Sequence, residues 1–377
     1  MTDTDVLIVG AGPTGLTLAA ALLLQGVSVT LVDRQAEGAN TSRAAGVNAR
    51  SLEVLDRIDV TRRLVKEGVE APRFTIRDRA ATLLTVDFSG LATDYPFTLL
   101  VPQSTTERLL LERVRELGGD VIRPKTLVTV AQDAARVTAT FDDGDTVSAR
   151  YLVGADGMHS TVRTQAGIGF TGGAYEHEFV LADARLRGDA PTDEVRLFWA
   201  SEGLTVVAPL PDGAFRIVAP MDGAPEHPSA DLVQRLLDDR GPGGLVVTDV
   251  VWSSRFRIHH RVADDYRAGR VLLAGDAAHV HSPAGGQGMN LGIQDAIALA
   301  DALAAVLDGA PDTRLDDYAA TRRPIAEQVV ALTDRLTRLA TIPRSLRPLR
   351  NALLGLVGRM PALTRALAAR LSGLVYR

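Results

Sequence analysis

The opening residues of the chain alternate between apolar runs and glycine-rich breaks. Residues 6–9 are continuously apolar, as in a parallel strand that is buried on both faces. Residues 16–25 are rich in Ala and Leu and lead to Gly26, the residue type that commonly ends a helix. Residues 27–32 form a second β-branched run, which ends at Asp33. The pattern predicts one βαβ unit.

Later segments continue to mix strand and helix patterns. Residues 103–118 have the periodicity of an amphipathic helix, and strand-like runs between 127 and 141 lead to a hairpin signal at 142–145. Buried strands are predicted at 151–154 and at 270–274, and a loop and a long helix follow the second of these. The chain therefore leaves one sheet and returns to it late.

The region from about residue 173 to 252 is strand-rich and carries several turn signals, which predicts an inserted second domain. We therefore predict an α/β fold in which a Rossmann-like domain holds an inserted β-rich domain and is followed by C-terminal helices. The predicted ranges are 1–72, 98–173 and 252–332 for the first domain, 73–97 and 174–251 for the β-rich domain, and 333–377 for the helices.

Length and composition narrow the functional class. A chain of 377 residues is long enough for two domains. The formal charge of -5 argues against a nucleic-acid surface, which needs clustered basic side chains. The chain has no cysteine, which excludes disulfides and any cysteinyl bond to a cofactor. We see no secretion signal and no apolar run of membrane-spanning length, so we expect a cytoplasmic protein without a transmembrane segment.

The last segment is strongly basic. Residues 335–377 carry nine arginines, and the nearest acid is Asp334. A basic amphipathic helix can lie on a membrane or bind an acidic partner. We favour the simpler interpretation, in which these helices pack on the core and expose a solvated face.

A glycine-rich turn connects the predicted first strand to the first helix. Gly10, Gly12 and Gly15 form a G-x-G-x-x-G run, in which the glycines permit a tight turn, a close backbone approach to a pyrophosphate, and helix–strand packing. Asp33 would accept hydrogen bonds from an adenosine ribose and repel a 2′-phosphate. The pocket therefore favours FAD or NAD over NADP. The alternative is a glycine turn in an unrelated α/β protein.

A second glycine-rich loop lies near residue 276 and favours a flavin over a nicotinamide. A predicted strand ends at Gly275 and Asp276, and residues 285–288 lead into a helix. The positive end of that helix would stabilise the negative charge of a reduced flavin. His279 and His281 suggest catalytic bases or metal ligands, but a third ligand is missing from the loop, so we favour hydrogen-bonded histidines and no metal site.

Three motifs together resemble the FAD-dependent aromatic hydroxylases of the p-hydroxybenzoate hydroxylase family, the group A flavin monooxygenases. They are the run at residues 10–15, the run at 154–163 (Gly-Ala-Asp-Gly-Met-His-Ser-Thr-Val-Arg), and Gly275-Asp276 with its Gly-Gly-Gln-Gly-Met-Asn continuation. They occur in the family's order and approximate spacing. The chain ends before the thioredoxin-like domain that many antibiotic-tailoring members carry, and a homodimer could supply the missing packing.

The resemblance implies non-covalent FAD binding by a defined set of residues. Arg43 would contact the pyrophosphate region as the flavin moves, and Pro283 would lie beside the isoalloxazine ring, so these two are the expected catalytic residues. Surface roles for Arg43 and Arg108 and a turn-fixing role for Asp156 stay open alternatives. For Met289 and Phe198 we favour packing over chemistry. The implied cofactor-binding residues are Gly10, Gly12, Gly15, Asp33, Arg34, Arg43, Gln103, Arg108, Asp156, Asp276, Pro283, Gly286, Gly288, Met289 and Asn290.

The resemblance also implies the reaction. NAD(P)H would visit transiently and reduce FAD, the reduced flavin would bind O2 as a C4a-hydroperoxide, and one oxygen would pass to an aromatic, polycyclic polyketide-like substrate. Alternatives on the same scaffold are a flavin reductase, an epoxidising or Baeyer–Villiger oxygenase, and a non-enzymatic flavin-binding partner. From the β-rich domain we expect four residues in the substrate pocket: Phe198, Val207, Pro209 and Arg216.

Overall fold

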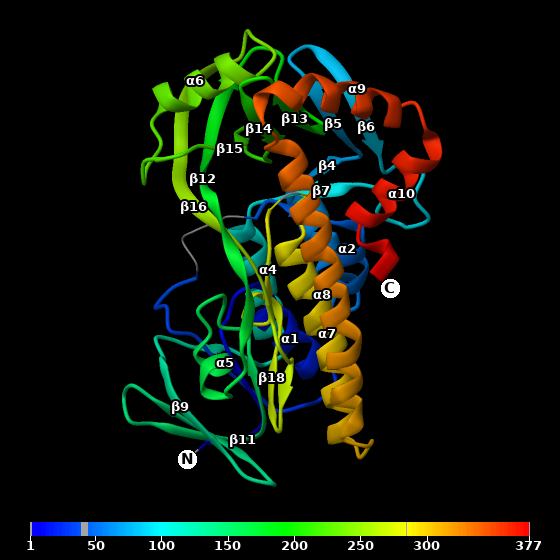
Figure 1. Cartoon of the computed structure of the whole chain (residues 1–377). Coiled ribbons are helices and arrows are strands. Elements are labelled where there is room, and N and C mark those ends of the chain that lie inside the picture. The colour runs from blue at the N-terminus through cyan, green and yellow to red at the C-terminus, as the bar shows by residue number, and fades with distance from the viewer. Residues whose placement is uncertain (1, 39–43, 284, 377) are drawn as a thin grey trace.

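The computed structural model describes residues 2–38, 44–283 and 285–376. Two eight-stranded sheets organise them, one in the lower and one in the upper half of the view, and a long helix runs beside both (Figure 1). The predicted α/β class is confirmed. The division into exact residue ranges stays a prediction, and two strands, β12 (Phe170–Arg187) and β16 (Val246–Ala263), cross its boundaries.

The first sheet has the order β17-β18-β11-β1-β2-β8, with β9 and β10 attached through β11. Its middle strands β18, β11, β1, β2 and β8 run parallel. The central apolar runs, residues 6–9, 31–32, 151–154 and 271–273, are buried, as expected with helices on both faces. The strand bounds are β1 Thr2–Val9, β2 Val29–Val32, β8 Val121–Ile122, β9 Leu127–Gln132, β10 Val137–Phe141, β11 Thr146–Gly154, β17 Arg267–Ala268 and β18 Val271–Leu273.

Helices α1 (Pro13–Leu24), α4 (Gln103–Glu116), α5 (Thr161–Gln165) and α7 (Gly288–Leu307) accompany this sheet. The βαβ unit predicted for the N-terminus is thereby confirmed, as are the helix at 103–118, the strand at 151–154 and the hairpin at 142–145. Within the described ranges α7 is long and apolar enough to cross a membrane, but 67% of its apolar window is buried in the protein, so it is a core helix.

The second sheet is mostly antiparallel and has the order β19-β16-β12-β15-β14-β13-β5-β6. Helix α6 (Ala230–Arg240) covers one of its faces, and Phe198, Val207 and Ile217 pack beneath that helix. The remaining strand bounds are β5 Arg73–Asp78, β6 Ala81–Asp87, β13 Glu194–Ala200, β14 Gly203–Pro209, β15 Phe215–Pro220 and β19 His279–Val280.

A small third sheet links the two large ones. It has the order β3-β7-β4, with β3 at Gly46–Val47, β7 at Thr98–Leu100 and β4 at Val69–Ala71. Helices α2 (Ala49–Asp56) and α3 (Thr61–Glu67) lie between its strands in sequence. Ala71 and Leu100 pack against Val195 and Ala208 of the second sheet, so the face of that sheet opposite α6 is turned toward the first domain.

The C-terminal segment wraps around the second sheet. Helix α8 (Thr313–Ala340) runs along the molecule, and α9 (Arg347–Val357) and α10 (Pro361–Leu371) lie against β5 and β6 (Figure 1). Pro348 and Pro361 lie in the first turns of α9 and α10, where proline is tolerated. Arg350 also departs from the expected solvated face, because it is buried and donates to the carbonyl of Trp199 at 2.8 Å.

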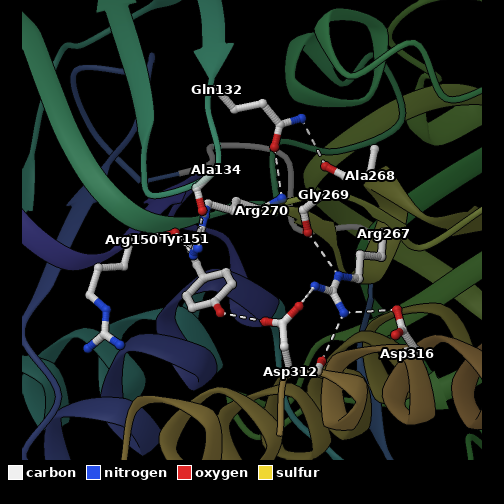
Figure 2. A network of polar contacts seen from close by, with 10 residues as sticks. All are labelled: Gln132, Ala134, Arg150, Tyr151, Arg267, Ala268, Gly269, Arg270, Asp312 and Asp316. Atoms are coloured by element: carbon white, nitrogen blue, oxygen red, sulfur yellow. Dashed lines mark hydrogen bonds and ion pairs between the residues drawn. The ribbon is translucent and has the colours of Figure 1, made fainter. Parts of the chain in front are cut away.

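A polar network fixes the start of β18 (Figure 2). Arg267 binds the carboxylates of Asp312 and Asp316 at the beginning of α8, and the hydroxyl of Tyr151 donates to Asp312 at 2.6 Å. Arg270 donates to the carbonyl of Ala134 at 2.9 Å and lies over the ring of Tyr151. These bonds join three segments at the point where the chain re-enters the first sheet.

Glycines let α1, α7 and the loop after β18 meet closely. A Cβ at Gly292 would lie 2.3 Å from the hydroxyl of Thr14 and 3.1 Å from the Cα of Gly275. A Cβ at Gly275 would lie 2.4 Å from the same hydroxyl. The two distances to the Thr14 hydroxyl are shorter than any normal Cβ contact. The N-terminal glycine turn and the late glycine loop can therefore approach this closely only because both positions lack a Cβ atom.

The Gly292 contact generates the first prediction. Gly292→Ala should lower the free energy of unfolding by about 1–3 kcal/mol, because an added methyl overpacks the junction. Gly355→Ala is the matched control, since Gly355 is also helical and its Cβ would meet no atom within 4 Å. Adding Thr14→Ala should restore part of the loss. Urea unfolding measures all three, and equal effects of the two glycine substitutions would contradict the packing.

Candidate active site

The predicted motifs meet at one edge of the first sheet. Val9 of β1 is in register with Gly154 of β11 and Val32 of β2, and Gly154 is in register with Leu273 of β18. Because these strands are parallel, the turns that follow them lie side by side, at the edge where α/β sheets bind their ligands. The three glycine-rich motifs and Asp33 therefore converge.

Gly10 and Gly15 are required by backbone contacts. Gly10 has a φ of 106°, and a Cβ there would lie 2.2 Å from the carbonyl oxygen of Ala155. A Cβ at Gly15 would lie 1.8 Å from the carbonyl oxygen of Gly10. These two glycines join the first motif to the second and bring α1 against its own strand.

Gly12 is different, and it provides the test of whether a dinucleotide fits. A Cβ at Gly12 would meet no atom of the described residues within 4 Å, so packing within that part of the chain does not demand glycine at this position. Gly12 is also the N-cap of α1, and it carries no side-chain cap for the first N–H groups of the helix. Open space beside uncapped N–H groups suits a pyrophosphate. The residues present fit FAD.

Asp33 lies at the end of β2, as predicted. Its carboxylate accepts from the backbone N–H of Ala11 at 2.6 Å and of Gln35 at 2.8 Å, so it also holds the glycine turn in place. Arg34 is exposed beside it. Arg123, which the sequence analysis did not identify, donates to the carbonyl of Ala11 at 3.3 Å and belongs to the same edge.

The helix α4 residues separate in space. Gln103 accepts from the N–H of Ala44 at 3.2 Å and donates to the buried Glu107 at 2.7 Å, so this pair faces the loop that follows Asp33. Arg108 turns away: its guanidinium is half-exposed and pairs with Glu67 and Glu112. The structure therefore favours the surface role that the sequence left open for Arg108. Arg43 lies outside the described residues.

Asp156 organises its own turn. Its carboxylate accepts from the hydroxyl of Ser160 at 2.5 Å and from the N–H groups of Thr161 and Val162 at 2.7 and 3.1 Å. Thr161 and Val162 begin α5, so Asp156 caps N–H groups that have no partner within the helix. Burial raises the pKa of Asp156, and the hydrogen bonds oppose that effect. The turn-fixing role is observed, and a cofactor role stays a prediction.

Arg163, the last residue of the second motif, links it to the third. Its buried guanidinium donates to the carbonyl of Ala277 at 2.8 Å and to that of Met158 at 2.9 Å. It also lies 3.8 Å from the ring centre of Phe170. Burial lowers the pKa of Arg163. Arg163 belongs to the second motif, but its spacing alone predicts no role for it.

The third motif forms the second glycine turn. The 3₁₀ turn η1 (Gly275–Ala277) exposes Asp276, and Pro283 is also exposed. The carbonyl of Pro283 accepts from the N–H of Gly286 at 2.8 Å. Among the residues that the structure describes, a Cβ at Gly286 would meet nothing within 4 Å, which repeats the open arrangement of Gly12. This turn leads into the N-terminus of α7.

The start of α7 is fixed from two sides. Gly288 and Met289 are half-buried, and Met289 packs against the core of the first domain. Asn290 is buried, and its amide donates to the carbonyls of Gly46 and Gly286 at 2.8 and 2.6 Å. Gln287 donates to the carbonyl of Leu371, at the end of α10, at 2.9 Å. Asn290 and Gln287 therefore position the second turn.

A buried ionic cluster supports the same loop and was not predicted. Asp295 binds His279 at 2.6 Å and Arg322 at 2.6 Å. Burial alone would raise the pKa of Asp295, but the charges of Arg322 and His279 lower it. His279 is thus a hydrogen-bonded loop histidine. Within residues 2–38, 44–283 and 285–376 no three His, Asp or Glu side chains form a group that could hold a metal ion.

His281 is the other histidine of this loop. Its Nδ1 lies 2.8 Å from the carbonyl of Ser282, and its ring stacks on that of His279 with 6.5 Å between ring centres. Burial lowers the pKa of His281 to about 4, so the ring is neutral at neutral pH. A neutral ring in this place adds no charge to the second glycine turn.

The expected substrate wall needs a correction. Phe198 and Val207 are fully buried beneath α6, on the face of the second sheet that is turned away from the first domain. Pro209 follows Val207 by two residues on β14, so it lies on the same face, and it is paired with Phe215 of the same cluster. These three residues are core. Arg216 alone points the other way, where it binds Asp183 at 2.8 Å and the carbonyl of Ala44 at 2.8 Å.

The open space at Gly12 generates a prediction about the cofactor. Gly12→Val should abolish flavin absorbance in the purified protein without changing its circular dichroism, because the side chain fills space that no protein atom uses. Gly90→Val is the matched control, since a Cβ there also meets nothing within 4 Å and the position lies far from the motifs in sequence. Normal flavin content in Gly12→Val would contradict the site.

The buried cluster of Asp295, His279 and Arg322 generates a prediction about stability. Asp295→Asn should lower the free energy of unfolding by about 3–5 kcal/mol, because it leaves the buried Arg322 without its counter-charge. The control is Asp301→Asn on the same helix, where an exposed pair with Arg57 is worth less than about 1 kcal/mol. Denaturant titration compares the two variants. Similar losses would mean that the cluster does not hold the loop.

Comparison with known proteins agrees with this geometry. Residues 3–333 match a family model described as an FAD binding domain. The chain is 39% identical over 346 residues to the rifampicin monooxygenase of Streptomyces venezuelae, with 86% of this chain and 69% of that protein covered. It is 38% identical over 399 residues to the anhydrotetracycline monooxygenase of Streptomyces rimosus, with 99% and 77% covered.

Solved structures show the same likeness. An anhydrotetracycline hydroxylase from Streptomyces rimosus superposes with a TM-score of 0.82 at 37% identity, covering 99% of this chain and 76% of that one. A p-nitrophenol 4-monooxygenase from Pseudomonas putida superposes with a TM-score of 0.88 at 26% identity, covering 99% of both chains. The chain therefore belongs to the FAD-binding-domain family of flavin-dependent monooxygenases and is an FAD-dependent aromatic hydroxylase.

Proposed function

We propose that this hydroxylase uses NAD(P)H and O2 to hydroxylate a polycyclic, polyketide-like aromatic substrate. The observation that carries the proposal is the convergence of two open glycine positions, Gly12 and Gly286, at the starts of α1 and α7. The names of the tetracycline and rifampicin relatives support the substrate class.

In this proposal the chain grips FAD at both ends. Gly12 and the N–H groups of α1 would bind the pyrophosphate, Asp33 the adenosine ribose, and Asp276 the ribityl region. Gly286 and the start of α7 would face the pyrimidine side of the isoalloxazine ring, where the helix dipole favours negative charge. When bound, FAD supplies the redox chemistry that takes electrons from NAD(P)H and activates O2.

The substrate would enter between the flavin loops and the face of the second sheet opposite α6. Arg216 and Asp183 form a buried pair on that face. Phe179 precedes Asp183 by four residues along β12, so both side chains lie on the same face of the sheet. Phe179 stacks on Phe256 with 5.5 Å between ring centres. An aromatic pair on the same face as a buried arginine suits a phenolic ring system. The walls exclude water from the reacting ring.

An oxygenase that epoxidises or performs Baeyer–Villiger insertion is the second candidate. The flavin-holding residues are the same for these reactions, and the relatives include monooxygenases of several kinds of aromatic compound. The discriminating property is where the oxygen atom ends, which depends on the substrate's pose.

The proposal is tested by incubating the FAD-loaded enzyme with NADH or NADPH, an anhydrotetracycline and ¹⁸O2. The expected product is heavier by one labelled oxygen and carries it as a ring hydroxyl, which fragmentation in a mass spectrometer locates. Gly12→Val serves as the flavin-free control and should form no product. Cofactor oxidation without label in the product would exclude a hydroxylase on this substrate class, and a ring-expanded lactone would favour the second candidate.

A further inference from the structure

The outward side of α9 is apolar, although it faces solvent. Leu346, Leu349, Leu353 and Leu356 recur at intervals of three and four residues, which places them on one side of a helix. Their exposed fractions are 50%, 71%, 54% and 57%. The 3₁₀ turn η2 (Arg344–Leu346) contributes the first of them. We call these four residues the leucine stripe.

The stripe continues into the start of α10. Met360 and Leu363 follow at the same spacing and are 46% and 45% exposed. Helices α9 and α10 occupy the outer end of the molecule beside β5 and β6, where nothing else in the described chain lies over α9 in the view (Figure 1). The two helices are bent by 99° at their junction, so they do not form a single membrane-spanning helix.

The helix cannot turn its leucines inward, because its other side is firmly bound. Leu354 is 7% exposed and packs with Trp199 and the strands β5 and β6. Arg350 donates to the carbonyl of Trp199 and lies 5.1 Å from the centre of its indole ring. Asn351 donates to Asp78 at 2.7 Å. Helix α9 therefore has apolar residues on both sides: Leu354 and two polar anchors hold its inner side, and the leucine stripe forms its outer side.

The segment that carries the leucine stripe is basic, whereas the rest of the chain is acidic. Of the 41 basic and 46 acidic side chains, nine arginines and no acids lie in residues 335–377. Residues 1–334 therefore carry 32 basic against 46 acidic side chains. Arg344, Arg359 and Arg365 are exposed next to the stripe in sequence. The apolar stripe is thus embedded in a basic segment on an acidic protein.

We propose that the leucine stripe docks this protein on an anionic phospholipid bilayer. Exposed leucines insert into the boundary between headgroups and acyl chains, and flanking arginines bind acidic headgroups. The acidic remainder of the chain would be repelled by the same surface, so docking would be oriented with α9 toward the lipid.

A second copy of the chain fits this surface less well. Two stripes in contact would bring two arginine-rich segments together, with no acidic side chain of residues 335–377 to pair with them. An anionic lipid surface satisfies the apolar and the basic parts together. The inference concerns location and does not depend on the substrate.

Docking would occur close to the flavin loop. The end of α10 accepts a hydrogen bond from Gln287, which precedes α7, and the carbonyl of Ser372 accepts from the N–H of Arg50 at 3.0 Å. A Cβ at Gly285 would lie 2.8 Å from the side chain of Leu371. The helix pair that carries the stripe therefore also supports the second glycine turn.

The experiment is vesicle co-sedimentation of the FAD-loaded full chain. Vesicles of phosphatidylcholine with phosphatidylglycerol should bind it, pure phosphatidylcholine vesicles should bind it at least tenfold less, and added salt should weaken binding. The variant Leu349→Gln with Leu353→Gln should bind the anionic vesicles at least tenfold less. The matched control is Leu24→Gln with Val128→Gln, two residues of 46% and 47% exposure outside this surface, which should bind like the unmodified protein.

Three outcomes would overturn the proposal: no binding of the unmodified protein to anionic vesicles, equal loss in the control, or equal binding by the stripe variant. A dimer in light scattering that the stripe variant splits, without vesicle binding, would assign the surface to a second copy instead. Flavin content and unfolding midpoint are recorded for both variants, because the stripe lies outside the FAD site and should leave them unchanged.

Discussion

The close approach of glycine backbones at one edge of the first sheet is the constraint on which the site depends. Gly10 lies against Ala155, while Gly275 and Gly292 enclose Thr14, at distances that leave no room for a Cβ atom. Protein interiors are packed too densely to absorb such atoms without displacement. These contacts therefore set the distance between turns that are far apart in the sequence, and that distance determines which ligand can touch them all.

Two polar anchors hold strand β18 so that the second turn keeps its place. At the start of the strand, Arg267 joins it to the beginning of α8, as Figure 2 shows. Beyond its end, Asp295 binds His279 and Arg322, which come from the loop and from α8. Burying a carboxylate is costly, and the paired charges and hydrogen bonds offset that cost. A rigid loop is the benefit, because a flavin needs an ordered surface.

Local sequence patterns predicted secondary structure correctly where the signal lay within a short segment. The βαβ unit of residues 5–33 followed from hydrophobic runs and glycine spacing alone. Phe198 lies in the core beneath α6, in the packing role that was favoured for it. The sequence alone could not decide between core and substrate pocket, because alternation along a strand identifies two faces without saying which one meets the other domain. The Asp295–Arg322 pair was missed because its members lie 27 residues apart on two helices, although an aspartate among the apolar residues of a helix is a usable signal of a buried partner.

A crystal structure of the chain with FAD tests the central claim most directly. The account predicts one FAD molecule that spans both turns, with its pyrophosphate beside Gly12 at the start of α1 and its isoalloxazine ring beside Gly286 at the start of α7. An FAD that touches only one of these turns, or that binds elsewhere on the protein, would contradict the account.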